Sequence, residues 1–211
     1  MSPTAVVTGG SGGIGRVVVA ELRGRGWDVV SLSRREGCDV SDEAQVQRAF
    51  ERIESLDALI NGAAQLIKRP ILELTAADWD AQVDAGLRGA FLCSREAFRL
   101  MRKSGGSIVM VSSLSGVQGA EKFPGMAAYV AAKSGLAGLT EALAVEGRPR
   151  GIRVNAISPG AVDTPMLRIA GVEGPRLQPA EVARIIVWLA SPESAPLSGS
   201  NLRLDPTDRA T

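Results

Sequence analysis

Tyr129 and Lys133 are the two residues of this sequence whose types and spacing best fit proton transfer. Tyr129 is the only tyrosine of the chain, and Lys133 follows it by four residues within an apolar stretch. Residues i and i+4 lie on one face of a helix, and a nearby ammonium group favours the phenolate. We therefore expect Lys133 to lower the pKa of Tyr129 from about 10 and to fit it for general acid–base catalysis. Taken alone, the pair could equally be a fortuitous contact on a helix surface.

The absence of histidine limits the remaining chemistry. It excludes catalytic triads that use a histidine base and metal sites with histidine ligands. The two cysteines, Cys38 and Cys93, fit no C-x-x-C pattern, so we predict inert, buried thiols, with neither a disulfide nor a metal. Proton transfer is left to Tyr, Lys, Asp, Glu or Cys.

The segment "TGGSGGIG" at 8–15 has the composition of a phosphate-binding turn, because it joins a β-branched run to a helical pattern. It fits G-x-G-x-x-G from Gly10 and G-x-x-x-G-x-G from Gly9. A P-loop is excluded because Arg16 and Val17 stand where Lys and Ser or Thr are required. The alternative to phosphate binding is that the glycines only permit a tight strand-to-helix turn.

Strand and helix patterns alternate along the whole chain. We expect six strands, at 4–9, 28–33, 57–61, 106–113, 152–160 and 200–205. Helices are expected at 14–26, 42–53, 75–103, 127–147 and 179–191, the second capped by Ser41 and the third beginning with Thr75 and Asp78 as a capping box. This order predicts an α/β fold: a single-domain, Rossmann-like doubly wound parallel sheet with helices on both faces, spanning residues 1–211.

The composition fits such a fold and excludes several partners. The net charge of +1 gives no general attraction to nucleic acid, and no apolar run reaches the roughly 18 residues of a membrane span. The first residues enter a strand pattern without a charged or apolar leader, so we expect a cytoplasmic protein.

Other motifs accompany the tyrosine and lysine at strand ends, where doubly wound folds place their ligands. Ser112 and Ser113 end one predicted strand, and Pro159-Gly160 and Thr164 follow another. With these motifs the sequence resembles the short-chain dehydrogenase/reductase family over essentially its whole length. The resemblance also rests on the pair Asp39-Val40 and on the "NGAA" segment at 61–64. It favours the Gly9, Gly13, Gly15 register of the glycine turn.

The resemblance implies the site residues. Ser113, Tyr129 and Lys133 match the family's catalytic residues. The predicted coenzyme-binding positions are Gly9, Ser11, Gly13, Ile14, Gly15, Ser33, Arg34, Asp39, Val40, Asn61, Gly62, Ala63, Tyr129, Lys133, Pro159, Gly160, Val162 and Thr164. Ser33 and Arg34 are inferred from their residue types, and the resemblance implies the others.

The end of the second predicted strand bears on coenzyme choice. An acidic residue there would bind the ribose 2′-OH and repel a 2′-phosphate. Here Ser33 is followed by Arg34 and Arg35, and serine and arginine both bind phosphate. We therefore predict NADP(H) in preference to NAD(H). The alternative is that the arginines form solvated surface pairs.

The resemblance also implies the reaction. Hydride passes between NADPH and the carbonyl carbon of a small-molecule ketone, or back from an alcohol. Tyr129 exchanges the proton of the carbonyl oxygen, Ser113 hydrogen-bonds that oxygen, and Lys133 lowers the tyrosine pKa and holds the nicotinamide ribose. A homodimer or homotetramer through the long helices at 75–103 and 125–147 is implied as well.

Three departures qualify this prediction. Gly86 replaces a family asparagine that holds a water in a proton relay, and Gly62 and Ala64 alter the "NNAG" segment. The substrate lid after Thr164 is reduced to residues 165–178, whereas the interval before Tyr129 is extended at 116–126. The extension either walls the pocket or is a surface insertion. The alternative function is a catalytically weak or silent NADP(H)-binding sensor.

Overall fold

Six parallel strands form one sheet in the order β2-β1-β3-β4-β5-β6. The computed structural model describes residues 2–101 and 105–205. The strands are β1 Thr4–Thr8, β2 Asp28–Leu32, β3 Ala58–Asn61, β4 Gly106–Val111, β5 Ile152–Pro159 and β6 Asn201–Leu204. Thr8 pairs with Leu32 on one side and with Asn61 on the other, so these three strands end level. The six predicted strands and the doubly wound parallel sheet are confirmed.

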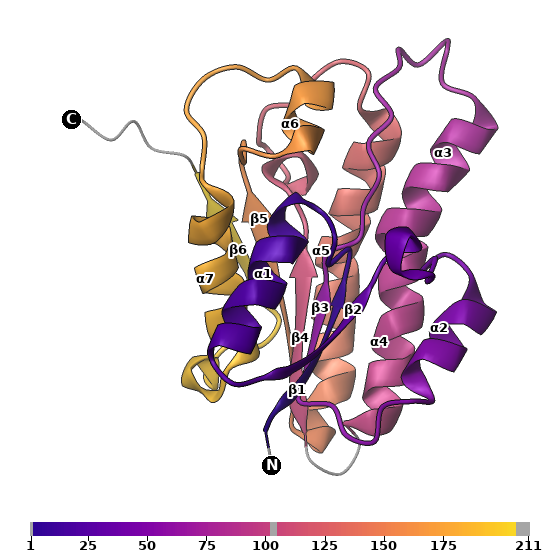
Figure 1. Ribbon diagram of the computed structural model, residues 1–211. Helices are drawn as coiled ribbons and strands as arrows, with labels where there is room; N and C mark the ends of the chain where they lie inside the picture. Colours follow the sequence, from indigo (N-terminus) through magenta and orange to yellow (C-terminus); the bar gives the residue numbers. More distant parts are fainter. Residues whose placement is uncertain (1, 102–104, 206–211) are drawn as a thin grey trace.

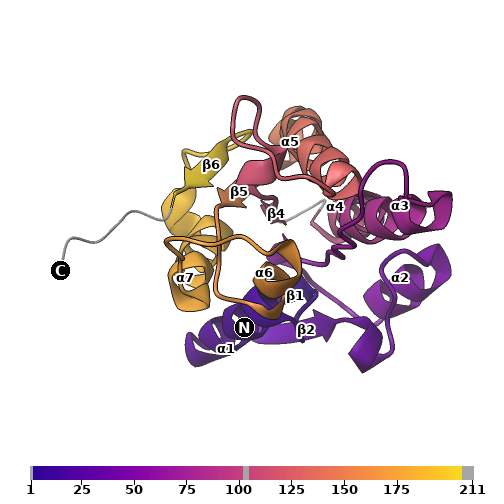
Figure 2. The same ribbon diagram turned by 90° about the horizontal axis from the view of Figure 1, so that it is seen from above.

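Helices cover both faces of the sheet (Figures 1 and 2). One face carries α1 Gly13–Gly24 and α7 Pro179–Ala190; the other carries α2 Glu43–Phe50, α4 Gly89–Leu100 and α5 Ala127–Gly147. Strand β1 shows why its sequence is apolar throughout: Val6 points into one core, whereas Ala5 and Val7 point into the other.

The start of α2 differs from the prediction. Asp42, not Ser41, is the N-cap, and its side chain accepts a hydrogen bond from the Gln45 amide at 3.0 Å. Ser41 is unavailable because its hydroxyl donates to the Asp39 carboxylate at 2.7 Å. Two adjacent residues could each cap this helix, and a local turn decided between them.

The long helix expected at 75–103 is interrupted. It consists of α3 Ala76–Val83, a π-helical segment Asp84–Arg88 and α4. Its predicted start is confirmed, because the Thr75 hydroxyl accepts a hydrogen bond from the Asp78 amide. Residues 102 and 103 lie outside the described residues. Buried Gly86 lies inside the π-helical segment.

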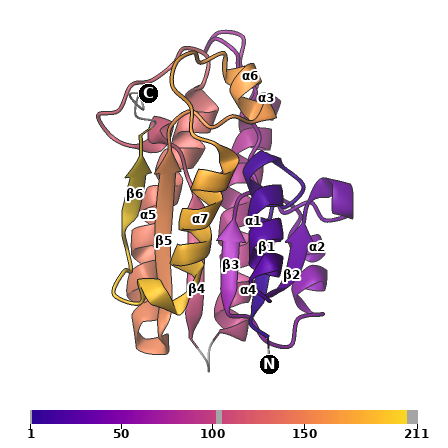
Figure 3. The same cartoon turned by 60° about the vertical axis from the view of Figure 1, so that its left-hand side comes forward.

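The carboxyl ends of the strands lie at the end of the molecule that carries α6 Pro165–Ala170 (Figure 3). This short helix lies within the reduced segment that follows Thr164. Pro165 occupies its first turn, and Gly171 ends it in the left-handed conformation, with φ 62°.

Candidate active site

The glycine turn between β1 and α1 packs closely against its neighbours. A Cβ atom on Gly9 would lie 2.9 Å from the Ala63 nitrogen, one on Gly13 would lie 2.6 Å from the Thr164 methyl carbon, and one on Gly15 would overlap the Gly9 carbonyl oxygen. Gly9 also has a φ of 70°. Packing therefore requires glycine at all three positions of the Gly9, Gly13, Gly15 register. Because these contacts are internal, the pyrophosphate contact stays a prediction.

The "NGAA" segment links β1 and β3 at the point where the strand order reverses. The Thr8 hydroxyl oxygen accepts hydrogen bonds from the amides of Gly62 and Ala63 at 3.0 and 3.1 Å. The Asn61 amide group donates to the Ser94 hydroxyl at 3.1 Å, and Asn61 Oδ1 is buried without a partner among the described residues. The altered segment thus still connects the two strands through Thr8.

Strand β4 and helix α5 bring the three catalytic candidates together. A hydrogen bond ties the end of β4 to α5: the Ser112 hydroxyl donates to the Lys133 carbonyl oxygen at 2.8 Å. Ser113 is the next residue along the chain. Ser113 and Tyr129 both line a cavity of about 430 Å³ at the carboxyl edge of the sheet. Lys133 is buried behind the tyrosine, with Nζ 5.6 Å from the centre of its ring.

The pKa values of this pair differ from the expectation. Burial raises the pKa of Tyr129, and a hydrogen bond with the Ser113 side chain only partly opposes that rise. Burial also lowers the pKa of Lys133 to about 8. The ammonium group donates to the Val111 carbonyl oxygen at 2.6 Å and lies over the tyrosine ring. The predicted lowering of the Tyr129 pKa by Lys133 is therefore wrong.

A carboxylate that the sequence analysis missed lies at the end of β2. Glu36 Oε2 accepts hydrogen bonds from the Ser33 hydroxyl at 2.5 Å and from the Ser31 hydroxyl at 2.9 Å. Arg34 and Arg35 precede it in the 3₁₀ turn Arg34–Glu36 and form no ion pair within the described residues. The signal was present, because Glu36 follows Gly15 by 21 residues, about the interval at which dinucleotide folds place their ribose-binding acid.

The Asp-Val pair after this turn is engaged within the protein. The Asp39 carboxylate accepts hydrogen bonds from the amide and hydroxyl of Ser41. Val40 is buried against Gly89, where a Cβ atom would lie 2.7 Å from a Val40 methyl group. Val40 therefore has a packing role whether or not it also contacts an adenine.

The cavity combines predicted and unpredicted residues. The predicted ones that line it are Ile14, Ser113, Tyr129, Pro159, Gly160, Val162 and Thr164. The other predicted positions lie outside it: Gly9, Ser11, Gly13, Gly15, Ser33, Arg34, Asp39, Val40, Asn61, Gly62, Ala63 and Lys133.

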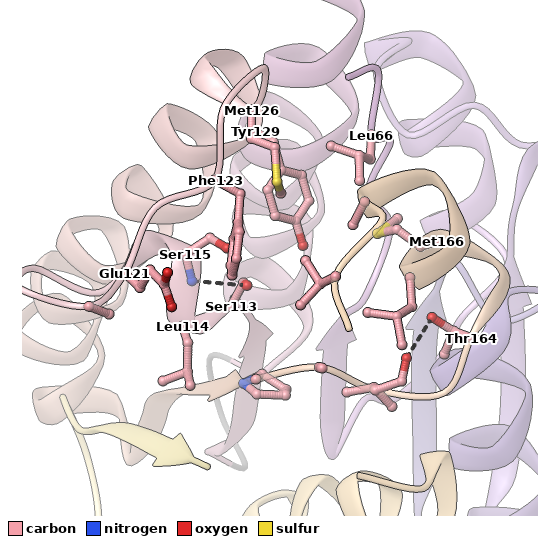
Figure 4. A pocket seen from close by; sticks show the side chains of 18 of the residues that line it. Leu66, Ser113, Leu114, Ser115, Glu121, Phe123, Met126, Tyr129, Thr164 and Met166 are labelled. Carbon is pink, nitrogen blue, oxygen red and sulfur yellow. Dashed lines mark hydrogen bonds between the residues drawn. The ribbon is translucent and has the colours of Figure 1, made fainter. Parts of the chain in front are cut away.

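Apolar side chains from three distant segments complete the cavity walls. Figure 4 shows Phe123, Met126 and Tyr129 on one side, and Leu66, Met166 and Thr164 on the other. The extension at 116–126 therefore walls the pocket and is not a mere surface insertion. Its apolar residues were the signal in the sequence.

Gly86 is not imposed by crowding within the chain. A Cβ atom there would lie 3.5 Å from the Ala132 Cβ atom, an ordinary contact distance.

The described residues include no group of three Cys, Asp or Glu side chains placed to hold a metal ion. Over the same residues, no helix is both long and apolar enough to cross a bilayer.

Comparison with known proteins decides the family. Residues 33–206 match a family model described as Enoyl-(Acyl carrier protein) reductase. A carbonyl reductase family member 4 from Danio rerio is 35% identical, and the match covers 97% of each chain. The chain belongs to the short-chain dehydrogenase/reductase family.

Two further proteins that resemble this short-chain dehydrogenase/reductase are also dehydrogenases. A 3beta-hydroxysteroid dehydrogenase from Mediterraneibacter gnavus is 38% identical over 76% of this chain, and the match spans 66% of that relative, just under two thirds. The ligand-free aldohexose dehydrogenase of Thermoplasma acidophilum superposes with a TM-score of 0.89 at 27% identity, covering 100% of this chain and 97% of the other.

Proposed function

We propose that this chain is an NADP(H)-dependent oxidoreductase, a single domain over residues 1–211 that interconverts a small-molecule ketone and its secondary alcohol. The observation that carries the proposal is the shared cavity. The Ser113 and Tyr129 hydroxyls line it together with Pro159, Gly160 and Thr164 from the end of β5. A carbonyl placed there can meet both hydroxyls at the edge where this fold binds its coenzyme.

The residues around the glycine turn fit a dinucleotide. Helix α1 has no acidic residue in its first turn, and no side chain caps its N-terminus, so its amide groups can receive a pyrophosphate. Asn61, Gly62 and Ala63 lie beside this turn through Thr8. When bound, the nicotinamide group supplies or accepts the hydride.

The protein's own part in the reaction is proton transfer and charge stabilisation. Because burial raises the pKa of Tyr129, its hydroxyl keeps its proton at neutral pH and can give it to the oxygen of a ketone. Ser113 donates a hydrogen bond to the same oxygen as its negative charge develops. Lys133 holds a cation behind the ring, and the coenzyme ribose is the further partner that we assign to it.

The sensor function predicted as an alternative has no observation in its favour, and turnover separates the two. We expect NADPH consumption with some member of a panel of ketones and quinones, and consumption at least about a hundredfold slower by Tyr129→Phe. Tight NADPH binding without turnover of any substrate would contradict the enzymatic function, and no dinucleotide binding would contradict both functions.

The proposed preference for NADP(H) rests on Ser33, Arg34 and Arg35. The guanidinium groups of the two arginines form no ion pair with the described acidic residues. NAD(H) is a second candidate coenzyme. Glu36 favours it, because a carboxylate can accept a hydrogen bond from a ribose hydroxyl. The double change Ser33→Asp, Arg34→Leu should shift the ratio of Kd values toward NAD(H). Unaltered NADP(H) affinity would contradict a role for these residues.

The quaternary structure belongs to the same proposal: a cytoplasmic homodimer or homotetramer through the long helices. Phe91 on α4 and Val145 on α5 support it, because their side chains are 45% and 66% exposed although apolar. We expect light scattering to give a mass of two or four chains, and Phe91→Glu to lower it. A monomeric wild-type protein would contradict this part alone.

A further inference from the structure

The pocket roof is assembled from three segments that are far apart in the sequence: 62–75, 117–126 and 165–175. They meet in one apolar cluster around Tyr129, whose buried members are Leu66, Met126, Tyr129 and Ala170. Phe123, Met166 and Val172 pack against it. The size of the substrate space therefore depends on how these three segments are held together.

Two backbone amides in the middle of the segment 62–75 tie it to neighbouring parts of the chain. The Ile67 amide donates to Oε1 of Gln82, a buried side chain of α3, at 2.9 Å. The Arg69 amide donates to the Gly125 carbonyl oxygen, also at 2.9 Å. This segment is thus tied to α3 and to the segment 117–126.

The segment 165–175 is fixed differently, because backbone hydrogen bonds hold its base, the residues that flank it on both sides. The Leu177 amide donates to the Ala161 carbonyl at 2.8 Å, and the Asp163 amide donates to the Leu177 carbonyl at 2.9 Å. Above this base, one hydrogen bond joins residues 165–175 to a distant part of the described chain: Lys68 Nζ donates to the Ala170 carbonyl oxygen at 2.6 Å. α6 therefore depends on Lys68 for its polar contact with the rest of the roof.

Lys68 also contacts the remaining roof segment. A Cβ atom on Gly125 would lie 3.1 Å from Lys68 Cγ, and one on Gly171 would lie 3.5 Å from Lys68 Nζ. The lysine stem thus runs along Gly125 while its ammonium group reaches the end of α6. A cationic donor suits that position, because the last carbonyl groups of a helix carry partial negative charge.

We propose that Lys68 is a positioning residue that holds α6 over the pocket and thereby limits the size of the substrate. The inference rests on the proposed function, since it concerns access to the same cavity. Met166 and Ala170, which line the cavity, stand on the helix that Lys68 holds. Releasing α6 removes apolar contacts from a small ketone and makes room for a bulky one.

The test compares Lys68→Met and Lys68→Arg with the wild-type enzyme on cyclohexanone and on the bicyclic ketone 2-decalone. For Lys68→Met we expect the KM of cyclohexanone to rise roughly three- to tenfold, as for the loss of one charged hydrogen bond near the surface. The kcat should hold, because Ser113 and Tyr129 lie on other elements, and kcat/KM should shift toward 2-decalone. Lys68→Arg should restore the wild-type ratio.

A second measurement is independent of activity. Hydrogen exchange of the amides of residues 166–171 should be faster in Lys68→Met than in the wild-type protein or Lys68→Arg. Arg150→Met is the matched control, because Arg150 donates to the Glu146 carbonyl near the end of α5, at the opposite edge of the sheet. It should change neither measurement.

The outcomes separate the two proposals. If the wild-type enzyme reduces no ketone, the proposed function fails, whereas exchange still tests the contact between Lys68 and α6. Unchanged exchange in Lys68→Met would overturn the inference. Faster exchange with an unchanged preference between the two ketones would also overturn it, because Lys68 would then have only a structural role.

Discussion

The centre of the sheet's carboxyl edge and its outer end hold their polar groups in different ways. At the centre, β4 and α5 bury Lys133 and Ser112 and bind both side chains to backbone carbonyls. At the outer end, β2 pairs with one strand only among those described, and the exposed Glu36 is held by the side chains of Ser31 and Ser33. Lys133, which is proposed for the reaction, is thus fixed by the fold, whereas the groups proposed for coenzyme choice are fixed by one another.

Tyr129→Phe tests the central region with the largest expected effect. The change removes only the hydroxyl that we propose as the proton donor to the substrate oxygen. We expect kcat for ketone reduction to fall about 10²- to 10⁴-fold, the usual contribution of a general acid, with a far smaller change in coenzyme Kd. Steady-state kinetics and coenzyme titration measure this. Substantial remaining turnover would show that another group donates the proton.

Lys133→Met tests whether the central region buries an unfavourable charge. Because burial lowers the folded-state pKa of Lys133 to about 8, the unfolded chain binds more protons between pH 8 and about 10.5. Below pH 8 the cost of burying the ammonium is fully present, and it is relieved as the pH rises through this window. From pH 7.5 to 9.5 the wild-type protein should therefore gain about 2 kcal/mol of unfolding free energy relative to Lys133→Met.

Urea denaturation at the two pH values checks this difference. Tyr129 does not disturb it, since the tyrosine pKa is raised and acts only above about pH 10. Equal pH dependence of the two proteins would mean that Lys133 titrates normally and that the central region is open to water.

Glu36→Gln tests the outer region. The amide keeps a carbonyl oxygen for the two serine hydroxyls but removes the charge that opposes a 2′-phosphate. We expect the Kd of NADP(H) to fall about tenfold and that of NAD(H) to rise slightly, without loss of stability. Titration with both coenzymes measures this, and Glu54→Gln, at another exposed acid, is the control. Unaltered affinity for both coenzymes would remove Glu36 from the specificity region.

Gly86→Asn has the smallest expected effect. The contact distance to Ala132 leaves space for the first side-chain atom, so the variant should fold. If Gly86 limits proton transfer behind Lys133, kcat should rise by less than about tenfold, while coenzyme affinity stays constant. A constant kcat would mean that the proton leaves by another route.

Local patterns predicted the strands, most helices and the residues at the strand ends, because these depend on neighbours within a few positions. The cap of α2 was missed because Asp42 and Ser41 compete for the same role. The π-helical interruption at 84–88 was missed because the sequence pattern of a helix stays much the same when one of its turns widens. The contact between Lys68 and Ala170 joins residues 102 positions apart, and no local pattern encodes it. The raised pKa of Tyr129 depends on burial, which the i+4 spacing does not reveal.

The π-helical segment has a consequence for how the long helix is built. An α-helix turns about 100° per residue, so the extra residue of a wide turn rotates everything before it relative to everything after it. Gln82, before the segment, therefore faces Ile67 of the pocket roof, while Leu92 and Cys93, after it, face the sheet core. Deleting one residue from Asp84–Arg88 would join the two helices smoothly and turn Gln82 away from Ile67. The irregular turn thus lets one helix serve both the core and the rim of the pocket.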